Sequence, residues 1–444
     1  MKKRLFGTDG VRGKVGDEPM TADFAMRLAS AAAKVLKLKG GKVVIGKDTR
    51  LSGYMFESAL EAGFVAAGVD VILLGPLPTP GIARLTQELD ANLGVVISAS
   101  HNAYYDNGIK FFDSLGSKFS DEIEKKIEEQ INEKAMTVDS RSLGKAKFID
   151  NARLQYQEFC SRSIPQGLDL SGLKIVFDGA NGAGYKVGPR TLGNLGADVV
   201  PIGCSPNGRN INDGCGSTFP DLLQSTVKAL NADVGVALDG DGDRLVMVDE
   251  CGQLIDGDQL LYILAIARFD DNNLVGPVVG TVMSNLGLEK SLEARKIKFK
   301  RAQVGDRNVL KILKESGGVI GGENSGHMIV LDKTTTGDGL ISALQVLAIM
   351  KKHQKKLSML AAGMSKYPQV NIDVQVGEYF DVETSKKIQN AISLAEADLS
   401  DDGRVVLRAS GTEPVVRIMV EGSDKDQITL IARQLAEVVT DLAS

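Results

Sequence analysis

The 444-residue chain contains no tryptophan and only three histidines and four cysteines. The cysteines, Cys160, Cys204, Cys215 and Cys251, form no C-x-x-C pair, so their spacing predicts neither a disulfide scaffold nor a zinc site. No run of about 18 apolar residues is present, which argues against a transmembrane helix. No apolar segment follows the charged N-terminal residues, which argues against a signal peptide. We therefore expect a cytoplasmic protein with free thiols.

An excess of positive charge is also missing. Lys and Arg number 52 against 57 Asp and Glu, which gives a formal net charge of −5. Nucleic-acid-binding surfaces are basic, so we expect no nucleic-acid partner, and no block of like charge predicts a membrane-binding patch. The hydrophobic share of 43% and the charged share of 25% are typical of globular proteins with sizeable cores.

Glycine, by contrast, is abundant. The chain has 49 glycines, a share above the roughly 7% of an average protein, and they follow no period. Such a number suits many tight turns between strands and helices. Short apolar, β-branched runs alternate with helical patterns and lie at 43–45, 71–74, 95–97, 175–177, 199–200, 234–238, 278–279 and 319–320. This alternation predicts β-α-β units with mainly parallel sheets.

The chain length predicts about three domains at roughly 150 residues each, with two or four also allowed. The phrase at 67–71 resembles the one at 195–199, which indicates structurally related α/β domains. A polar stretch at 136–147, a turn at 251–253 and Tyr367-Pro368 suggest boundaries. We therefore place domains at 1–150, 151–253, 254–367 and 368–444.

Two helices stand out in the pattern. Isoleucines recur at helical spacing in 121–134, and Ser120 precedes them as an N-cap. The chain ends in a helical pattern at 427–442. Two extended runs precede it, at 405–407 and 415–420, so the last domain is expected to be a small α+β domain.

Four short polar motifs each follow an apolar run. In parallel α/β sheets, ligands bind beyond the carboxyl ends of the strands, so these motifs could surround one cleft. The first places Ser100 beside His101, with Lys110 ten residues further on. A hydroxyl can carry a phosphoryl group, and His and Lys can move protons. The alternative is a serine N-cap in a polar turn.

The second motif alternates carboxylates with glycine, at Asp239, Asp241 and Asp243, and ends in Arg244. Carboxylates at this spacing can converge on one hard cation, whereas without a cation they would repel one another. A solvated acidic turn is the alternative. An EF-hand is disfavoured because Arg244 stands where that loop needs glycine and because the flanks are typical of strands.

The third motif offers a carboxylate, an amide, a hydroxyl and a histidine, at Glu323, Asn324, Ser325 and His327. Such a set can form hydrogen bonds with the hydroxyls or amine of a sugar, and a turn with incidental polar residues is the alternative. The fourth motif has the donors needed to dock a phosphate monoester, unless it is a hairpin turn with surface arginines. Its residues are Arg408, Ser410, Gly411, Thr412 and Arg417.

Together and in this order, the four motifs and the segment Phe6-Gly7-Thr8-Asp9-Gly10-Val11-Arg12-Gly13 resemble those of the α-D-phosphohexomutases. The resemblance runs nearly end to end and is greatest to the bacterial phosphoglucosamine mutase branch. It implies three related α/β domains with mixed or parallel sheets, and a small C-terminal α+β domain, around a central cleft.

The resemblance also implies roles for individual residues. Ser100 would be a phosphoserine and, with Asp239, Asp241 and Asp243, would hold one Mg²⁺. His101, Lys110 and His327 are similar to the family's candidate acid, base or supporting groups. Substrate-binding residues are implied at Arg244, Glu323, Ser325, Arg408, Ser410, Gly411, Thr412 and Arg417, and residues supporting the reacting phosphate at Thr8, Arg12 and Arg50.

The implied activity is that of an isomerase that interconverts glucosamine 6-phosphate and glucosamine 1-phosphate. The reaction would pass through a bisphosphorylated sugar, be primed by a hexose or hexosamine bisphosphate, and feed the synthesis of UDP-N-acetylglucosamine and peptidoglycan precursors. The expected partner is a small-molecule sugar phosphate, with a homodimer left open. Phosphomannomutase or phosphoglucomutase activity, a sugar-phosphate phosphatase and a non-catalytic binding protein are the alternatives.

Two local features bear on this resemblance. Asn324 and the tract at 210–218 resemble the glucosamine branch. Ala103 departs from the family pattern, which usually has proline after Ser-His-Asn. Proline would fix the backbone φ angle, so its absence predicts a less rigid loop.

Overall fold

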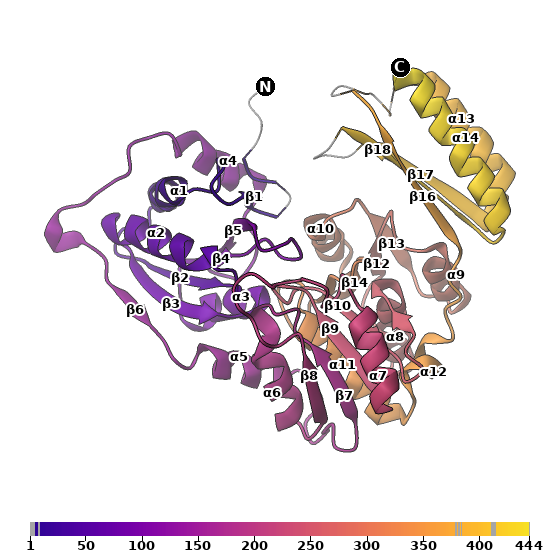
Figure 1. Cartoon of the computed structure of the whole chain (residues 1–444), viewed down its shortest axis with the longest axis horizontal. Helices are drawn as coiled ribbons and strands as arrows, with labels where there is room; N and C mark the ends of the chain where they lie inside the picture. Colours follow the sequence, from indigo (N-terminus) through magenta and orange to yellow (C-terminus); the bar gives the residue numbers. More distant parts are fainter. Residues whose placement is uncertain are drawn as a thin grey trace.

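The computed structural model describes residues 5–7, 9–377, 380, 382, 384–409 and 414–443. Their strands form four sheets, and each sheet, with its helices, belongs to one of four units that follow one another along the chain (Figure 1). The first three units alternate strands with helices, and the fourth is a small sheet covered by helices. The predicted α/β class with a small C-terminal α+β domain is thereby confirmed.

The first unit has a six-stranded mixed sheet with the order β1-β5-β4-β2-β3-β6. The central strands β2 and β4 are buried because both faces of the sheet are covered, as continuous apolar runs predict. Its elements are β1 (Val11–Lys14), α1 (Ala22–Val35), β2 (Lys42–Lys47), α2 (Ser52–Ala66), β3 (Asp70–Pro76), α3 (Thr79–Glu88), β4 (Leu93–Ile97), β5 (Asp106–Asp113), α4 (Asp121–Gln130), the 3₁₀ turn η1 (Ser140–Ser142) and β6 (Ala146–Phe148).

The second unit has a five-stranded sheet with the order β11-β10-β9-β7-β8. The last strand pairs with β10 across the turn predicted at 251–253, so this sheet extends two residues beyond the boundary expected at 253. Its elements are α5 (Ala152–Ser161), β7 (Lys174–Asp178), η2 (Ala183–Tyr185), α6 (Val187–Asn194), β8 (Asp198–Ile202), α7 (Asp221–Leu230), β9 (Val234–Leu238), β10 (Leu245–Val248) and β11 (Leu254–Ile255).

The third unit has a four-stranded sheet with the order β13-β12-β14-β15. Two of its helices, α8 and α11, also pack on β10 of the second unit, so the two units share one apolar core. The elements are α8 (Gly257–Asp270), β12 (Val278–Thr281), α9 (Leu286–Ala294), β13 (Phe299–Ala302), α10 (Asp306–Ser316), β14 (Ile320–Gly322), β15 (Met328–Val330), α11 (Gly339–His353) and α12 (Leu357–Ala361).

The fourth unit has an antiparallel sheet with the order β16-β18-β17. The sequence predicted two of these strands but not β16, whose outward residues alternate with half-buried ones and leave no apolar run. The unit has its own core and lies beside the third unit, away from the first (Figure 1). Its elements are β16 (Gln369–Gln375), α13 (Lys386–Leu399), η3 (Ser400–Asp402), β17 (Gly403–Ala409), β18 (Val415–Gly422) and α14 (Lys425–Ala443).

The helix predicted at 121–134 is shorter than expected. It ends at Gln130 because the chain turns at Ile131, whose side chain is buried in the core of the first unit. Ser120 occupies the N-cap position, but its side chain makes no capping hydrogen bond. Within the described part of the chain, no helix has both the length and the apolar character needed to cross a bilayer.

Candidate active site

Ser100 lies in the turn that follows β4, and its side chain points into the second unit. Its hydroxyl donates a hydrogen bond to Asp239 Oδ2 at 2.6 Å, and His101 Nδ1 lies 3.3 Å from the same Oγ. The Ser100 backbone has a φ angle of 52°, in the left-handed region, and only 1% of the residue is exposed. The first and second motifs therefore meet, although 139 residues separate them.

The second motif connects β9 to β10, which pair as antiparallel strands. The flanking strands confirm that the motif is no EF-hand. Asp239, Asp241 and Asp243 are buried and offer oxygen atoms that all lie within 4.8 Å of one another. Gly240 is needed at this point because a Cβ atom there would lie 2.6 Å from the Ser100 carbonyl oxygen. The glycines thus let the carboxylate loop approach the Ser100 turn.

The carboxylates of this loop repel one another. Burial, and then the charges of Asp241 and Asp243, raise the pKa of Asp239 well above its ordinary value. One oxygen each of Asp241 and Asp243 is buried and has no hydrogen-bond partner among the described residues. Converging carboxylates with unsatisfied oxygens are the ligands that a divalent cation prefers, so this donor set fits a metal ion.

Lys110, on β5, lies against the same carboxylates. Its Nζ is 2.8 Å from Asp9, 2.8 Å from Asp241 and 3.8 Å from Asp243. Burial alone would lower the pKa of Lys110, but these three carboxylates outweigh burial and raise it. The buried ammonium therefore stays charged and neutralises part of the negative charge of the loop.

The two histidines have opposite environments. Burial, followed by the charges of Arg244 and Arg12, lowers the pKa of His101 to about 4. Burial acts in the same direction on His327, but ion pairs with Asp243 and Asp306, each at 3.6 Å, raise its pKa to about 9. At neutral pH His101 is neutral and His327 is protonated, so the site holds one imidazole that can accept a proton and one that carries positive charge.

A chain of ion pairs links the first unit to the third. Lys118 Nζ lies 2.5 Å from both Asp9 Oδ1 and Asp306 Oδ2, and Asp306 in turn pairs with His327. Asp306 and Lys118 were missed by the sequence analysis. The local signal in the sequence was the polar run that follows Gly305. In the structure Gly305, with a φ angle of 114°, is the N-cap of α10.

Arg50, which the resemblance implied to support the reacting phosphate, contacts the backbone of the Ser100 loop. Its guanidinium is fully buried and donates hydrogen bonds to backbone carbonyls of the loop that carries Ser100. Arg12 pairs with Asp9 and donates to the Ala99 carbonyl at 3.5 Å. Thr8, which was predicted with them, lies outside the described residues.

The third motif lies next to the second. The Leu245 amide donates to the Gly326 carbonyl, and Arg244 forms a backbone bridge with His327. Glu323 is half-buried and accepts a hydrogen bond from the Gly305 amide at 3.0 Å, while Ser325 is exposed. The Asn324 amide, which was expected to be available to a sugar, donates to Asp256 and Asp258 at 3.1 and 3.0 Å. Asn324 therefore holds the loop, and Glu323 and Ser325 remain for a ligand.

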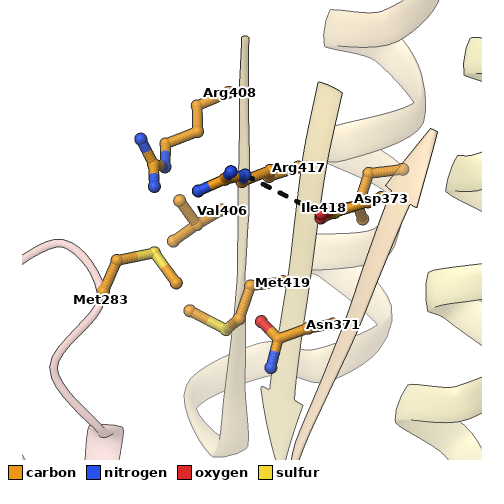
Figure 2. A pocket seen from close by; sticks show the side chains of 8 residues that line it. All are labelled: Met283, Asn371, Asp373, Val406, Arg408, Arg417, Ile418 and Met419. Atoms are coloured by element: carbon orange, nitrogen blue, oxygen red, sulfur yellow. Dashed lines mark ion pairs between the residues drawn. The ribbon is translucent and has the colours of Figure 1, made fainter. Parts of the chain in front are cut away.

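The fourth motif forms a separate cavity of about 250 Å³ on the sheet of the fourth unit (Figure 2). Arg408 on β17 and Arg417 on β18 are cross-strand partners, and their side chains point into the cavity beside Met283 of the third unit. Burial, and then the charge of Arg417, lower the pKa of Arg408. Two adjacent cations fit a doubly charged phosphate. Ser410, Gly411 and Thr412 lie outside the described residues.

The chain matches four family models in succession. They are described as the phosphoglucomutase/phosphomannomutase alpha/beta/alpha domains I, II and III and the C-terminal domain, and they cover residues 3–137, 155–252, 256–367 and 370–438.

Full-length relatives agree with these models. The chain is 54% identical over 440 residues to a phosphoglucosamine mutase of Nitrosococcus oceani, covering 99% of this chain and 98% of the relative. It is 53% identical over 440 residues to one of Aeromonas hydrophila, covering 99% of both chains.

Solved structures share the fold. A phosphoglucomutase/phosphomannomutase family protein from Burkholderia thailandensis superimposes with a TM-score of 0.83 at 25% identity, covering 100% of this chain and 99% of that one. N-acetylphosphoglucosamine mutase of Aspergillus fumigatus, solved with GlcNAc-6P and magnesium, has a TM-score of 0.73 at 19% identity, covering 99% and 96% of the two chains.

Proposed function

Because this chain belongs to the phosphoglucomutase/phosphomannomutase family, we propose that it is a phosphoglucosamine mutase, which interconverts glucosamine 6-phosphate and glucosamine 1-phosphate. Ser100 carries the phosphoryl group. The observation that most supports this role is the bond from Ser100 Oγ to Asp239, inside a cluster of three buried carboxylates. A nucleophilic hydroxyl beside a cation site is the arrangement that phosphoryl transfer needs.

In the first half of the reaction, the phosphorus–Oγ bond of phosphoserine 100 breaks, and a bond forms from phosphorus to the free hydroxyl oxygen of the sugar phosphate. Neutral His101 is positioned to accept the hydroxyl proton, and the imidazolium that forms returns this proton to the Ser100 Oγ that has lost its phosphoryl group. The product is a sugar bisphosphate. After it turns over in the cleft, the reverse transfer from its other phosphate restores phosphoserine 100.

Other residues bind and orient the sugar. Glu323 and Ser325 bind its hydroxyls or amine, Arg244 supports the reacting phosphate, and Arg408 and Arg417 hold the phosphate that does not react. Ser410, Gly411 and Thr412 are proposed to bind the same phosphate. Lys110 and His327 keep their protons and offset the charge that gathers during transfer.

Mg²⁺ is the metal that we assign to Asp239, Asp241, Asp243 and the Ser100 phosphate. When bound, it supplies positive charge that neutralises the oxygens of the transferring group. The residues fit this ion because all the donors are hard oxygens and two of them, among the described residues, accept no hydrogen bond.

The proposed reaction also implies a primer, a use for the product and a cellular compartment. A hexose or hexosamine bisphosphate primes Ser100, and the product feeds the synthesis of UDP-N-acetylglucosamine. The four cysteines are free. Free thiols persist in reducing compartments, which supports a cytoplasmic location.

The test is isomerisation of glucosamine 6-phosphate with Mg²⁺ and glucose 1,6-bisphosphate, with glucose and mannose phosphates in parallel. We expect glucosamine 6-phosphate to turn over best. Ser100→Ala should abolish turnover, whereas Ser225→Ala, at an exposed position on α7, should leave it unchanged. A preference for glucose or mannose would replace the substrate assignment. Steady release of inorganic phosphate at the rate of substrate loss would instead indicate a phosphatase.

A further inference from the structure

We propose that Arg50 and Asn212 are positioning residues that together hold Ser100 in its left-handed backbone conformation and aim its hydroxyl at the metal-binding loop. This inference rests on the proposed role of Ser100 in phosphoryl transfer. Neither side chain touches the Ser100 hydroxyl. Both act through the backbone of the loop that carries it.

The backbone at Ser100 needs outside support. A φ angle of 52° is uncommon for a residue with a side chain, because the Cβ atom crowds the following carbonyl. Such a conformation persists only where the surroundings fix it, and it is typical of functional sites. The Ser100 amide is held by Ser98 Oγ at 2.9 Å. Its carbonyl is held by the two residues proposed here.

Arg50 fixes the loop from within the first unit. Its Nη2 donates to the carbonyls of Ser100 at 2.9 Å and Asn102 at 2.8 Å. Its Nη1 donates to Ala103 and, at 3.1 Å, to Asp106. One planar side chain therefore restrains four carbonyls of a seven-residue stretch.

Asp48 orients this guanidinium. It accepts a hydrogen bond from Arg50 Nε at 2.8 Å and another from Ser98 Oγ at 2.6 Å. Asp48 is therefore the common partner of the two groups from the first unit that hold Ser100, the arginine on its carbonyl and the serine on its amide.

Asn212 fixes the loop from the second unit. Its Nδ2 donates to the Ser100 carbonyl at 2.9 Å and the Asn102 carbonyl at 3.0 Å. A Cβ atom at Gly240 would lie 2.7 Å from this nitrogen, so the amide is wedged between the Ser100 turn and the carboxylate loop. Since Asp239 belongs to the same unit as Asn212, this contact sets the distance between the nucleophile and the metal ligands.

The loop depends on these hydrogen bonds because residue 103 is alanine. Proline at this position would limit the loop through its ring, and this chain lacks it. The Ala103 carbonyl is one of the four that Arg50 holds. Hydrogen bonds from two side chains thus provide the rigidity that residue 103 does not.

The experiment compares Asn212→Gly with Asn231→Gly in the glucosamine 6-phosphate assay. Both asparagines have left-handed φ angles, of 59° and 46°, so glycine keeps each backbone and removes only the side chain. Asn231 ends α7 and is exposed, which makes it the matched control. We expect Asn212→Gly to lower kcat by about 10- to 100-fold, because misplacing a reacting group by about 1 Å costs that much. KM should stay within about twofold, and Asn231→Gly should keep the kcat of the parent chain.

A second pair of variants tests whether loop rigidity is the cause. Adding Ala103→Pro to Asn212→Gly should restore kcat by at least about threefold, since proline limits the same loop by another route. Arg50→Lys keeps the charge beside Asp48 but loses the planar fork, and it should lower kcat at least as much as Asn212→Gly, with its folding checked by circular dichroism.

Unchanged kcat in Asn212→Gly, or a rise in KM alone, would overturn the inference, as would a double variant no more active than Asn212→Gly. Ser100→Ala in the same assay separates this failure from a failure of the proposed function. If Ser100→Ala is inactive and Asn212→Gly is fully active, only the positioning role is lost. If Ser100→Ala is active, the proposed function itself is wrong.

Discussion

The side chains around Ser100 and those around Arg408 are both proposed to face phosphate groups of one substrate, yet they differ in burial and in partners. Ser100 is 1% exposed, and the carboxylates, lysine and histidine around it are tied into hydrogen bonds and ion pairs from three units. The Arg417 side chain is 41% exposed and lies on a sheet whose core is separate from the others.

The difference indicates how the two regions work. In the buried centre, charge and geometry are fixed before the substrate arrives, which favours the transfer step. In the open cavity, the arginines bind a group that does not react, and this binding depends on where the fourth unit lies. Substitutions in the centre should therefore lower kcat, and substitutions in the cavity should raise KM.

The largest effect is expected for Asp239→Asn. Loss of one carboxylate should lower kcat by about 10²- to 10³-fold, which is typical of removing one electrostatic group from an active site. The folded state of this variant should nevertheless be more stable than that of the parent chain when no metal is bound. Burial and repulsion raise the pKa of Asp239, so the ionised carboxylate destabilises the folded state at neutral pH without metal.

Thermal unfolding in EDTA measures this second effect: Asp239→Asn should melt above the parent chain. Asp198→Asn, at an exposed position on β8, is the control and should change neither kcat nor the melting temperature. A lower melting temperature for Asp239→Asn in EDTA would contradict the repulsion that the geometry indicates.

The next effect is expected for Arg408→Ala. Losing a charge-assisted hydrogen bond to phosphate should raise KM by about 10- to 100-fold with kcat changed only a few-fold. Steady-state kinetics would measure both constants, with Arg433→Ala on the exposed face of α14 as control. A fall in kcat without a rise in KM would remove the contrast between the two regions.

A smaller effect is expected for Arg404→Lys. Arg404 donates to the Val282 and Ser284 carbonyls at 2.8 and 2.6 Å and so joins the fourth unit to the third. Lysine keeps a charge beside Glu421 but loses the fork, and kcat/KM should fall by about 2- to 10-fold. Hydrogen exchange across 363–369 should rise in step, and Arg433→Lys should change neither quantity.

The smallest effect is a shift in melting temperature with Mg²⁺. At about 100 times its Kd, a ligand that binds only the folded state stabilises it by about 2.7 kcal/mol, which corresponds to a few °C in a chain of this size. Arg408→Ala should keep this shift and Asp239→Asn should lose it. Equal shifts in the two variants would place the metal away from the carboxylate loop.

The presence of the strands and the position of the loops that follow them could be predicted because they have local signals. The apolar runs at 95–97 and 234–238 are buried strands, and the polar motifs that follow them bring Ser100 and Asp239 together. The carboxylate spacing predicted the cluster, because alternation with glycine lets one short loop turn its oxygens to one point.

Side-chain direction and long-range pairing had no such signal. Asp9, Lys118 and Asp306 meet across 109 and 188 residues, and none of them lies in a pattern that marks the other two. The sequence resemblance placed Arg50 at the site, but only the packed loop shows that its guanidinium donates to backbone carbonyls. Asn212 lies in the tract at 210–218 that resembles the glucosamine branch, but nothing in the sequence indicates that its side chain binds the Ser100 carbonyl.

The division of the apolar cores also has a consequence for cooperativity. One cluster of buried side chains runs through the first three units, whereas the cluster of the fourth contains, among the described residues, only positions from 370 onward. Units with separate cores can unfold separately, so one melting curve need not describe the whole chain. On heating, the fourth unit can therefore lose its arginine cavity while the carboxylate centre stays folded, and inactivation then precedes global unfolding.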